Sequence, residues 1–149
     1  MIMDAGRPYR AELVVRFGHI DSAGIVYYPR LVNFLHVGME EFFGSVLETD
    51  YPSFLAEYRL GLPAARLEVD FLRPLRYGDH IQVEVGIESI GTSSIIWLYR
   101  IFRPDEDEPA TQARVVTVNV DMDTFEKLPV PDWLRQRLEA YRGTCEEIW

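Results

Sequence analysis

One stretch of the sequence decides the fold, PRLVNFLHVGMEEFFGSV, which runs from Pro29 to Val46. Apolar residues recur in it at spacings of three and four residues, the period of one face of an α-helix. These residues are Leu31, Leu35, Met39, Phe42, Phe43 and Val46. Proline suits the first turn of a helix, where its missing N–H costs no hydrogen bond. The sequence therefore predicts a long helix whose broad apolar face has to be buried.

The segments on either side of this helix alternate apolar and polar residues, which is the period of a β-strand. One such segment precedes the helix and four follow it, at residues 11–17, 65–71, 81–88, 94–102 and 113–122. Residues 94–102 are apolar on both faces, as in a central strand, with Trp97 and Tyr99 in the core or in an oligomer contact. Pro131 and Asp132 begin a short C-terminal helix. We expect an α+β fold in which a curled antiparallel sheet of about five strands wraps around one long central helix, as one domain over residues 1–149.

Composition and charge exclude some classes of function. The chain has 149 residues and a net charge of −9, which disfavours nucleic-acid binding, although a few local arginines can still hold a small phosphate-bearing molecule. No apolar run approaches the roughly 20 residues that span a bilayer, and the N-terminus lacks a secretory pattern. Cys145 is the single cysteine and cannot form an internal disulfide. We therefore expect a cytoplasmic protein without a membrane partner.

The segment between the first strand and the helix, FGHIDSAGIVYYP, contains the residues most able to carry chemistry. It places Asp21 in a tight loop just before a helix N-terminus, where free backbone amides favour a developing negative charge. Tyr28 is the better amide donor, because Pro29 has no N–H. A carboxylate that faces such a donor is the arrangement acyl transfer needs. An aspartate in a loop of this kind is, however, more often a turn or cap residue, so spacing alone leaves both interpretations open.

The stretch DSAGIVYYP, from Asp21 to Pro29, resembles the D-x-A-G-I-V-[WY]-Y-P pattern of the 4-hydroxybenzoyl-CoA thioesterase family. The likeness in element order extends over residues 9–142. The resemblance implies a hotdog fold and hydrolysis of acyl-CoA thioesters. It implies that Asp21 acts as nucleophile or general base, and that the Tyr28 amide polarises the thioester carbonyl. It also implies a homodimer or homotetramer with active sites between subunits, and neither a metal nor another cofactor.

The sequence departs from the family pattern at three places. One branch has histidine at the position of Tyr28, and its absence places this chain nearer to the branch that acts on aromatic acyl groups. His36 replaces an acidic residue of the helix, and a packed or solvated histidine is the favoured interpretation. Neutral residues 91–93 replace the basic segment that holds CoA phosphates. Arg73 and Arg76 are candidates for that role, with surface charge that binds no ligand as an equal alternative.

His19 and Gly24 are further candidates for substrate binding. The aromatic residues that suggest room for an aromatic acyl group, or an ordinary core, are Tyr27, Tyr28, Phe34 and Phe54. A hydratase or dehydratase of the same fold is one alternative, but it needs a histidine five residues after the loop aspartate, where this chain has Val26. A non-catalytic acyl-binding module is the other alternative, and it would leave the aspartate-containing loop unexplained.

Overall fold

The computed structural model describes residues 6–145. In chain order, the larger elements are β1 (Tyr9–Val14), α1 (Tyr28–Ser45), α2 (Tyr51–Tyr58), β3 (Ala64–Phe71), β4 (His80–Ile90), β5 (Ser94–Phe102), β6 (Thr111–Val118) and α3 (Asp132–Thr144). A short 3-10 helix, η1 (Phe17–His19), and two short strands, β2 (Leu60–Gly61) and β7 (Val120–Asp121), complete the list. None of the helices among these residues is long and apolar enough to cross a membrane.

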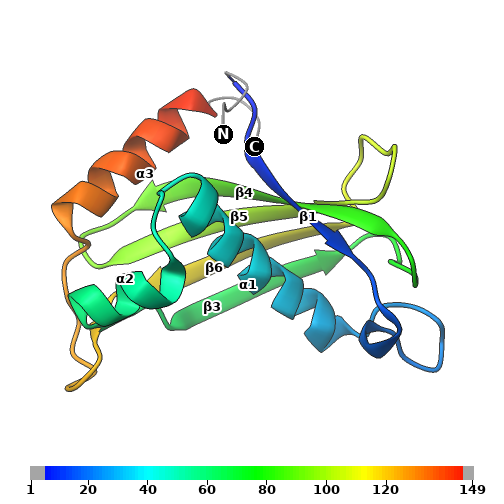
Figure 1. Cartoon of the computed structure of the whole chain (residues 1–149), viewed down its shortest axis with the longest axis horizontal. Helices are drawn as coiled ribbons and strands as arrows, with labels where there is room; N and C mark the ends of the chain where they lie inside the picture. Colours follow the sequence, from blue (N-terminus) through cyan, green and yellow to red (C-terminus); the bar gives the residue numbers. More distant parts are fainter. Residues whose placement is uncertain (1–5, 146–149) are drawn as a thin grey trace.

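The main sheet has five antiparallel strands in the order β1-β4-β5-β6-β3, and α1 lies across one face of it (Figure 1). The apolar face of α1 is buried as predicted, with Phe42 and Phe43 fully enclosed. Trp97 and Tyr99 of the central strand point into the same core and are buried, which confirms their assignment to the core. The predicted arrangement of a curled sheet around one long helix is therefore confirmed.

The strands predicted at residues 11–17 and 113–122 both end earlier than predicted. β1 ends at Val14, because Val15 bonds instead to the turn before β4, with the Val15 N–H donating to the Asp79 carbonyl at 2.9 Å, and the next residues bond within a 3-10 turn. Phe17 consequently lies in η1 and is 78% exposed, not on a buried strand face. The strand predicted at residues 113–122 is broken at Asn119, whose N–H donates to the Ser93 carbonyl, so that β7 leaves the main sheet and pairs with β2.

A second helix, α2, follows α1 and was not among the predicted elements. The Asp50 carboxylate caps it by accepting a hydrogen bond from the Ser53 N–H at 3.1 Å, and Pro52 occupies the first turn. Phe54 of α2 is fully buried against Phe43, with ring centroids 5.2 Å apart. The short helix therefore closes one end of the core beside α1.

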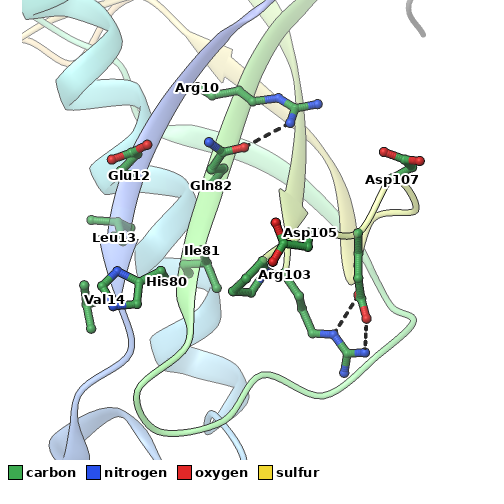
Figure 2. Close-up of a pocket in the computed structure, with 12 residues that line it drawn as sticks. Arg10, Glu12, Leu13, Val14, His80, Ile81, Gln82, Arg103, Asp105 and Asp107 are labelled. Carbon is green, nitrogen blue, oxygen red and sulfur yellow. Dashed lines mark hydrogen bonds and ion pairs between the residues drawn. The ribbon is translucent and has the colours of Figure 1, made fainter.

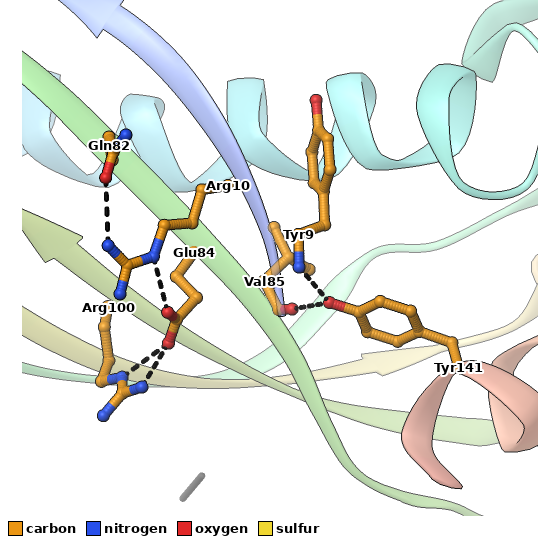
Figure 3. A network of polar contacts seen from close by, with 7 residues as sticks. All are labelled: Tyr9, Arg10, Gln82, Glu84, Val85, Arg100 and Tyr141. Carbon is orange, nitrogen blue, oxygen red and sulfur yellow. Dashed lines mark hydrogen bonds and ion pairs between the residues drawn. The ribbon is translucent and has the colours of Figure 1, made fainter. Parts of the chain in front are cut away.

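The face of the sheet away from α1 carries charged side chains that tie three strands together (Figure 3). Glu84 of β4 is fully buried there and accepts hydrogen bonds from Arg10 of β1 at 2.8 Å and Arg100 of β5 at 2.7 Å. The Arg10 guanidinium also lies 4.1 Å from the centre of the Phe102 ring. Because a buried carboxylate needs such partners, this arrangement fixes the edge strand β1 against the middle of the sheet.

Candidate active site

The loop that contains Asp21 is closed by backbone hydrogen bonds. The Asp21 N–H donates to the Ile25 carbonyl at 3.0 Å, and the Gly24 N–H donates to the Asp21 carbonyl at the same distance. Gly24 has a φ of 81°, a conformation that glycine adopts without strain. Gly24 therefore shapes the turn, and its predicted contact with substrate stays a prediction.

A second set of hydrogen bonds attaches this loop to the segment after β3. The Val26 N–H donates to the Leu75 carbonyl at 2.8 Å, and Ile25 pairs with Arg76 in an isolated β-bridge. Leu75 is buried in the core, so the segment that receives the loop is itself anchored. The structure thus places the Arg76 backbone beside the Asp21 loop, and the predicted role of Arg76 in phosphate binding stays a prediction.

The Asp21 carboxylate uses one of its oxygens to hold the turn. Oδ1 accepts a hydrogen bond from the Ala23 N–H at 2.8 Å, which is the Asx-turn expected of an aspartate in such a loop. The residue is exposed, and within residues 6–145 Oδ2 has no hydrogen-bond partner. The turn interpretation and the catalytic one are therefore compatible, because one oxygen fixes the orientation and the other faces solvent.

The N-terminus of α1 begins beside this loop with a free backbone donor. The Tyr27 carbonyl accepts the N–H groups of Arg30 and Leu31, and the Tyr27 N–H donates to the His19 carbonyl at 2.9 Å. Pro29 has no N–H, and the Tyr28 N–H makes no hydrogen bond with any described part of the chain. Because 18 residues of α1 add their dipoles behind it, the Tyr28 N–H is suited to binding an oxyanion.

His19 is half-buried and faces its own loop and α1. Its Nδ1 accepts a hydrogen bond from the Arg16 N–H at 2.8 Å. Its ring meets the Phe34 ring edge to face, with centroids 4.9 Å apart. The sequence analysis proposed a contact with substrate, but these contacts hold the loop in place.

Arg73 contacts a different part of the chain from Arg76. Its guanidinium pairs with Glu106 at 3.3 Å, and the hydrogen bond from Arg103, supported by Arg73, lowers the pKa of the Glu106 carboxyl. Glu106 lines a polar surface hollow of about 770 Å³ between the β1–β4 edge and residues 103–107 (Figure 2). Asp21 and Tyr28 are not among the residues that line this hollow, so Arg73 belongs to another region of the surface.

A smaller apolar pocket of about 190 Å³ lies between α1 and the β3 side of the sheet. Val32, His36 and Met39 line it from one face of α1, and Leu67 and Val115 line it from the strands. At a rise of about 1.5 Å per residue, Val32 is about 6 Å and His36 about 12 Å along the helix from Tyr28. An acyl group whose carbonyl lies at the helix N-terminus could therefore extend along α1 into this pocket. We favour it over the larger hollow, because an acyl group needs an apolar lining.

Val32 and Met39 of α1 were not predicted to line an acyl pocket, because the sequence suggested aromatic residues for that role. Phe34 and Phe54 are buried core residues and do not line this pocket, so the room they suggested is ordinary core packing. Val32, His36 and Met39 are spaced by four and three residues, so the sequence alone places them on one face of the helix. His36 also pairs with Glu40 at 3.0 Å, so the expected solvated helix histidine has an ion-pair partner.

Exposed aromatic rings surround the Asp21 loop. Tyr27 contacts Tyr28, and Tyr28 contacts Phe71 at the end of β3, with centroids 5.4 Å and 6.4 Å apart. Phe17 and Tyr77 form another edge contact at 6.5 Å. Soluble proteins rarely expose a large apolar patch without a binding role, so this surface indicates a ligand or a second subunit.

The histidine, cysteine and acidic side chains of residues 6–145 are the potential metal ligands in the described part of the chain. Nowhere in that part of the chain do three or more His, Cys, Asp or Glu side chains converge as a metal site requires. The chemistry available at the Asp21 loop is that of a carboxylate beside a backbone donor.

Comparison with known proteins supports this interpretation. Residues 15–138 match the thioesterase-like superfamily, which confirms the resemblance drawn from Asp21–Pro29. The chain is 26% identical over 132 residues to a 1,4-dihydroxy-2-naphthoyl-CoA hydrolase of Synechococcus elongatus, covering 88% of this chain and 95% of the relative.

Two solved structures share the fold. A 1,4-dihydroxy-2-naphthoyl-CoA thioesterase from Synechocystis superposes with a TM-score of 0.79 at 20% identity, over 87% of this chain and 94% of that one. A Thermus thermophilus thioesterase, solved in complex with coenzyme A and zinc, has a TM-score of 0.75 at 28% identity, over 93% and 96% of the two chains. The chain has the hotdog fold and belongs to the thioesterase-like superfamily.

Proposed function

We propose that this protein hydrolyses acyl-CoA thioesters to a free carboxylic acid and CoA, with Asp21 as the catalytic carboxylate. The observation that carries the proposal is the exposed Asp21 side chain in a loop that ends at the Tyr28 N–H; within residues 6–145, one Asp21 oxygen and that N–H have no hydrogen-bond partner. The carboxylate either attacks the thioester carbonyl or takes a proton from the attacking water. The Tyr28 N–H and the positive end of α1 stabilise the oxyanion that forms.

The proposed acyl group is aromatic. The apolar pocket along α1 has room for a compact ring system, and the hydrolase of Synechococcus elongatus is named for a naphthoyl substrate. A panel of aromatic and aliphatic acyl-CoAs, followed by thiol release, distinguishes the classes. A preference for aliphatic chains would reject the aromatic assignment while leaving the hydrolytic mechanism intact.

The hydratase alternative lacks its second proton-transfer group. Val26 occupies the required position and is buried, with its N–H bonded to Leu75. An acyl-binding module without activity predicts that acyl-CoA binds and is recovered unchanged. Turnover of a bound acyl-CoA therefore decides between that module and the enzyme.

The decisive test of mechanism is the variant Asp21→Asn, which keeps the Ala23 hydrogen bond but supplies neither a base nor a nucleophile. We expect kcat to fall about 10²-fold or more while substrate binding persists, because only the chemical step is removed. Tyr28→Phe is the matched control, since the proposed donor is the backbone N–H, and it should retain most of the activity. A thermal melt shows that both variants are folded, and an Asp21→Asn protein that keeps most of its turnover contradicts the mechanism.

We also propose a homodimer or homotetramer, with β3 as the contact strand. β3 pairs only with β6, and the side chains of Leu67 and Phe71 on it are 45% and 53% exposed. The Tyr28–Phe71 ring contact would set a second copy beside the Asp21 loop.

A pairing of dimers is supported by the other face of the sheet, where Ile96 and Leu98 of β5 are only half-buried. We place the protein in the cytoplasm, since its single cysteine is typical of a reducing compartment.

A further inference from the structure

His19 connects the two ends of the catalytic loop. Its side chain accepts the Arg16 N–H, and its own N–H donates to the Arg16 carbonyl at 3.0 Å. Its carbonyl accepts the Tyr27 N–H at 2.9 Å, one residue before the Tyr28 donor. A single residue therefore links the end of the segment after β1 to the N-terminus of α1.

The side-chain hydrogen bond requires an imidazole without a proton on Nδ1. A neutral histidine that accepts at Nδ1 carries its hydrogen on Nε2, whereas a charged histidine donates from both nitrogens. A proton on Nδ1 would face the Arg16 N–H, and two donors cannot form a hydrogen bond with each other. The ring also packs against Phe34, which is only 3% exposed, so reorienting the ring disturbs a core contact.

We propose that His19 is a positioning residue whose neutral imidazole holds the Asp21–Tyr28 loop in its active shape. Protonation of this imidazole removes the Arg16 hydrogen bond, loosens the loop and slows hydrolysis in mildly acidic solution. The rate effect rests on the thioesterase function proposed above, whereas the effect on the loop does not. The inference differs from the sequence-based assignment, which placed His19 in contact with substrate.

Few charged groups lie on the elements that contact His19. The loop contributes Arg16, Asp21 and the Tyr27 phenol, and the nearest charge on α1 is Arg30, about one helical turn from Phe34. Oδ1 of Asp21 accepts the Ala23 N–H, and within residues 6–145 neither oxygen of Asp21 bonds to His19. The hydrogen bond to Arg16 is therefore the contact that a change in the protonation of His19 alters directly.

Two variants separate this role from simple packing. In His19→Asn, the amide Oδ1 is attached to Cγ, as Nδ1 is in histidine. This oxygen can accept the Arg16 N–H, and the amide does not change its charge with pH. His19→Ala removes the acceptor altogether. Because a protonated His19 cannot accept the Arg16 N–H, kcat/KM of the parent should fall from neutral to acidic pH.

His19→Asn should keep a nearly constant kcat/KM over that range, and His19→Ala should have a low kcat at every pH. An acid limb shared by the parent and His19→Asn would belong to another group, such as the Asp21 carboxylate, and would overturn the proposal. Parental activity in His19→Ala at neutral pH would overturn it as well.

Hydrogen exchange of the Arg16 and Tyr27 amides tests the loop without substrate. Both amides should be protected in the parent at neutral pH. Their protection factors, which correct for intrinsic exchange, should fall at acidic pH in the parent and should not fall in His19→Asn. Protection that is independent of pH in the parent would refute the inference even if the enzyme is active. If no acyl-CoA is hydrolysed but protection follows the protonation of His19, the proposed function fails and the role of His19 stands.

Discussion

At the scale of single residues, Arg73 and Arg76 show how neighbours in sequence diverge in the structure. The backbone of Arg76 pairs with the Asp21 loop, and its guanidinium has no ion-pair partner within residues 6–145. Arg73 is occupied by Glu106 at the polar hollow. Of these two arginines, Arg76 therefore combines a charge without an ion-pair partner in residues 6–145 with a position beside the proposed site.

We predict that Arg76→Ala raises KM for an acyl-CoA about fivefold and leaves kcat nearly unchanged, because a phosphate contact remote from the carbonyl is lost. Arg73→Ala serves as the matched control and should leave KM within about twofold of the parent. Steady-state kinetics of the two variants measure both quantities. A larger KM effect in Arg73→Ala would assign the CoA phosphates to the other arginine.

Sequence patterns predict some residue roles and miss others. Asp21 and Tyr28 could be chosen because they lie in one short stretch whose order sets their relation. The bond from Arg16 to His19 could not, since it depends on the 3-10 turn that follows β1. The pairing of Arg73 with Glu106 was equally hidden, because it joins residues from separate turns of the sheet.

At the scale of elements, the packing of α1 on β4 depends on Gly38. A Cβ built at this buried position would lie 2.6 Å from Cγ1 of Val83, a fully buried side chain on the sheet. Valine is branched at Cβ and has few alternative rotamers, so it cannot readily move away. The helix can therefore lie close to the sheet only where a residue without a side chain faces it.

We predict that Gly38→Ala destabilises the protein by about 1–3 kcal/mol, although alanine is the better helix former. Gly44→Ala, in the same helix, meets no atom within 4 Å and should raise stability by up to about 1 kcal/mol. Urea unfolding of the two variants measures the free energies. Equal gains in both would show that α1 lies farther from β4 than the structure places it.

Periodicity predicted most elements correctly because burial on one face imposes it. It identified α1 and the five strands of the main sheet. It gave neither the strand order, which depends on pairing between distant segments, nor α2, which is too short for a helical pattern to stand out. The Asp50 cap and Pro52 were the local signals for that second helix.

At the scale of the whole molecule, the exposed edge of β3 governs assembly. We predict that Leu67→Asp converts the proposed dimer to a monomer, since it places charge within an apolar contact between copies. Activity should fall as well, but the mass is the test of the contact, because Leu67 also lines the apolar pocket along α1. Sedimentation velocity measures the mass, and circular dichroism shows whether the chain stays folded.

Met122→Asp is the matched control, because Met122 is 50% exposed but follows β7, outside the main sheet to which β3 belongs. This variant should keep the parental mass. A parent protein that sediments as a monomer at micromolar concentration would exclude the interface altogether.

The order of the strands also has a consequence for synthesis on the ribosome. β1 pairs with β4 and β3 pairs with β6, so both edge strands are made well before the strands that receive them. A nascent chain that has not reached Val118 cannot complete the five-stranded sheet. The Asp21 loop likewise cannot form its hydrogen bond to Leu75 or its β-bridge with Arg76 until the segment after β3 has been synthesised. The carboxylate that the site needs is thus translated well before the residues after β3 that attach its loop to the core.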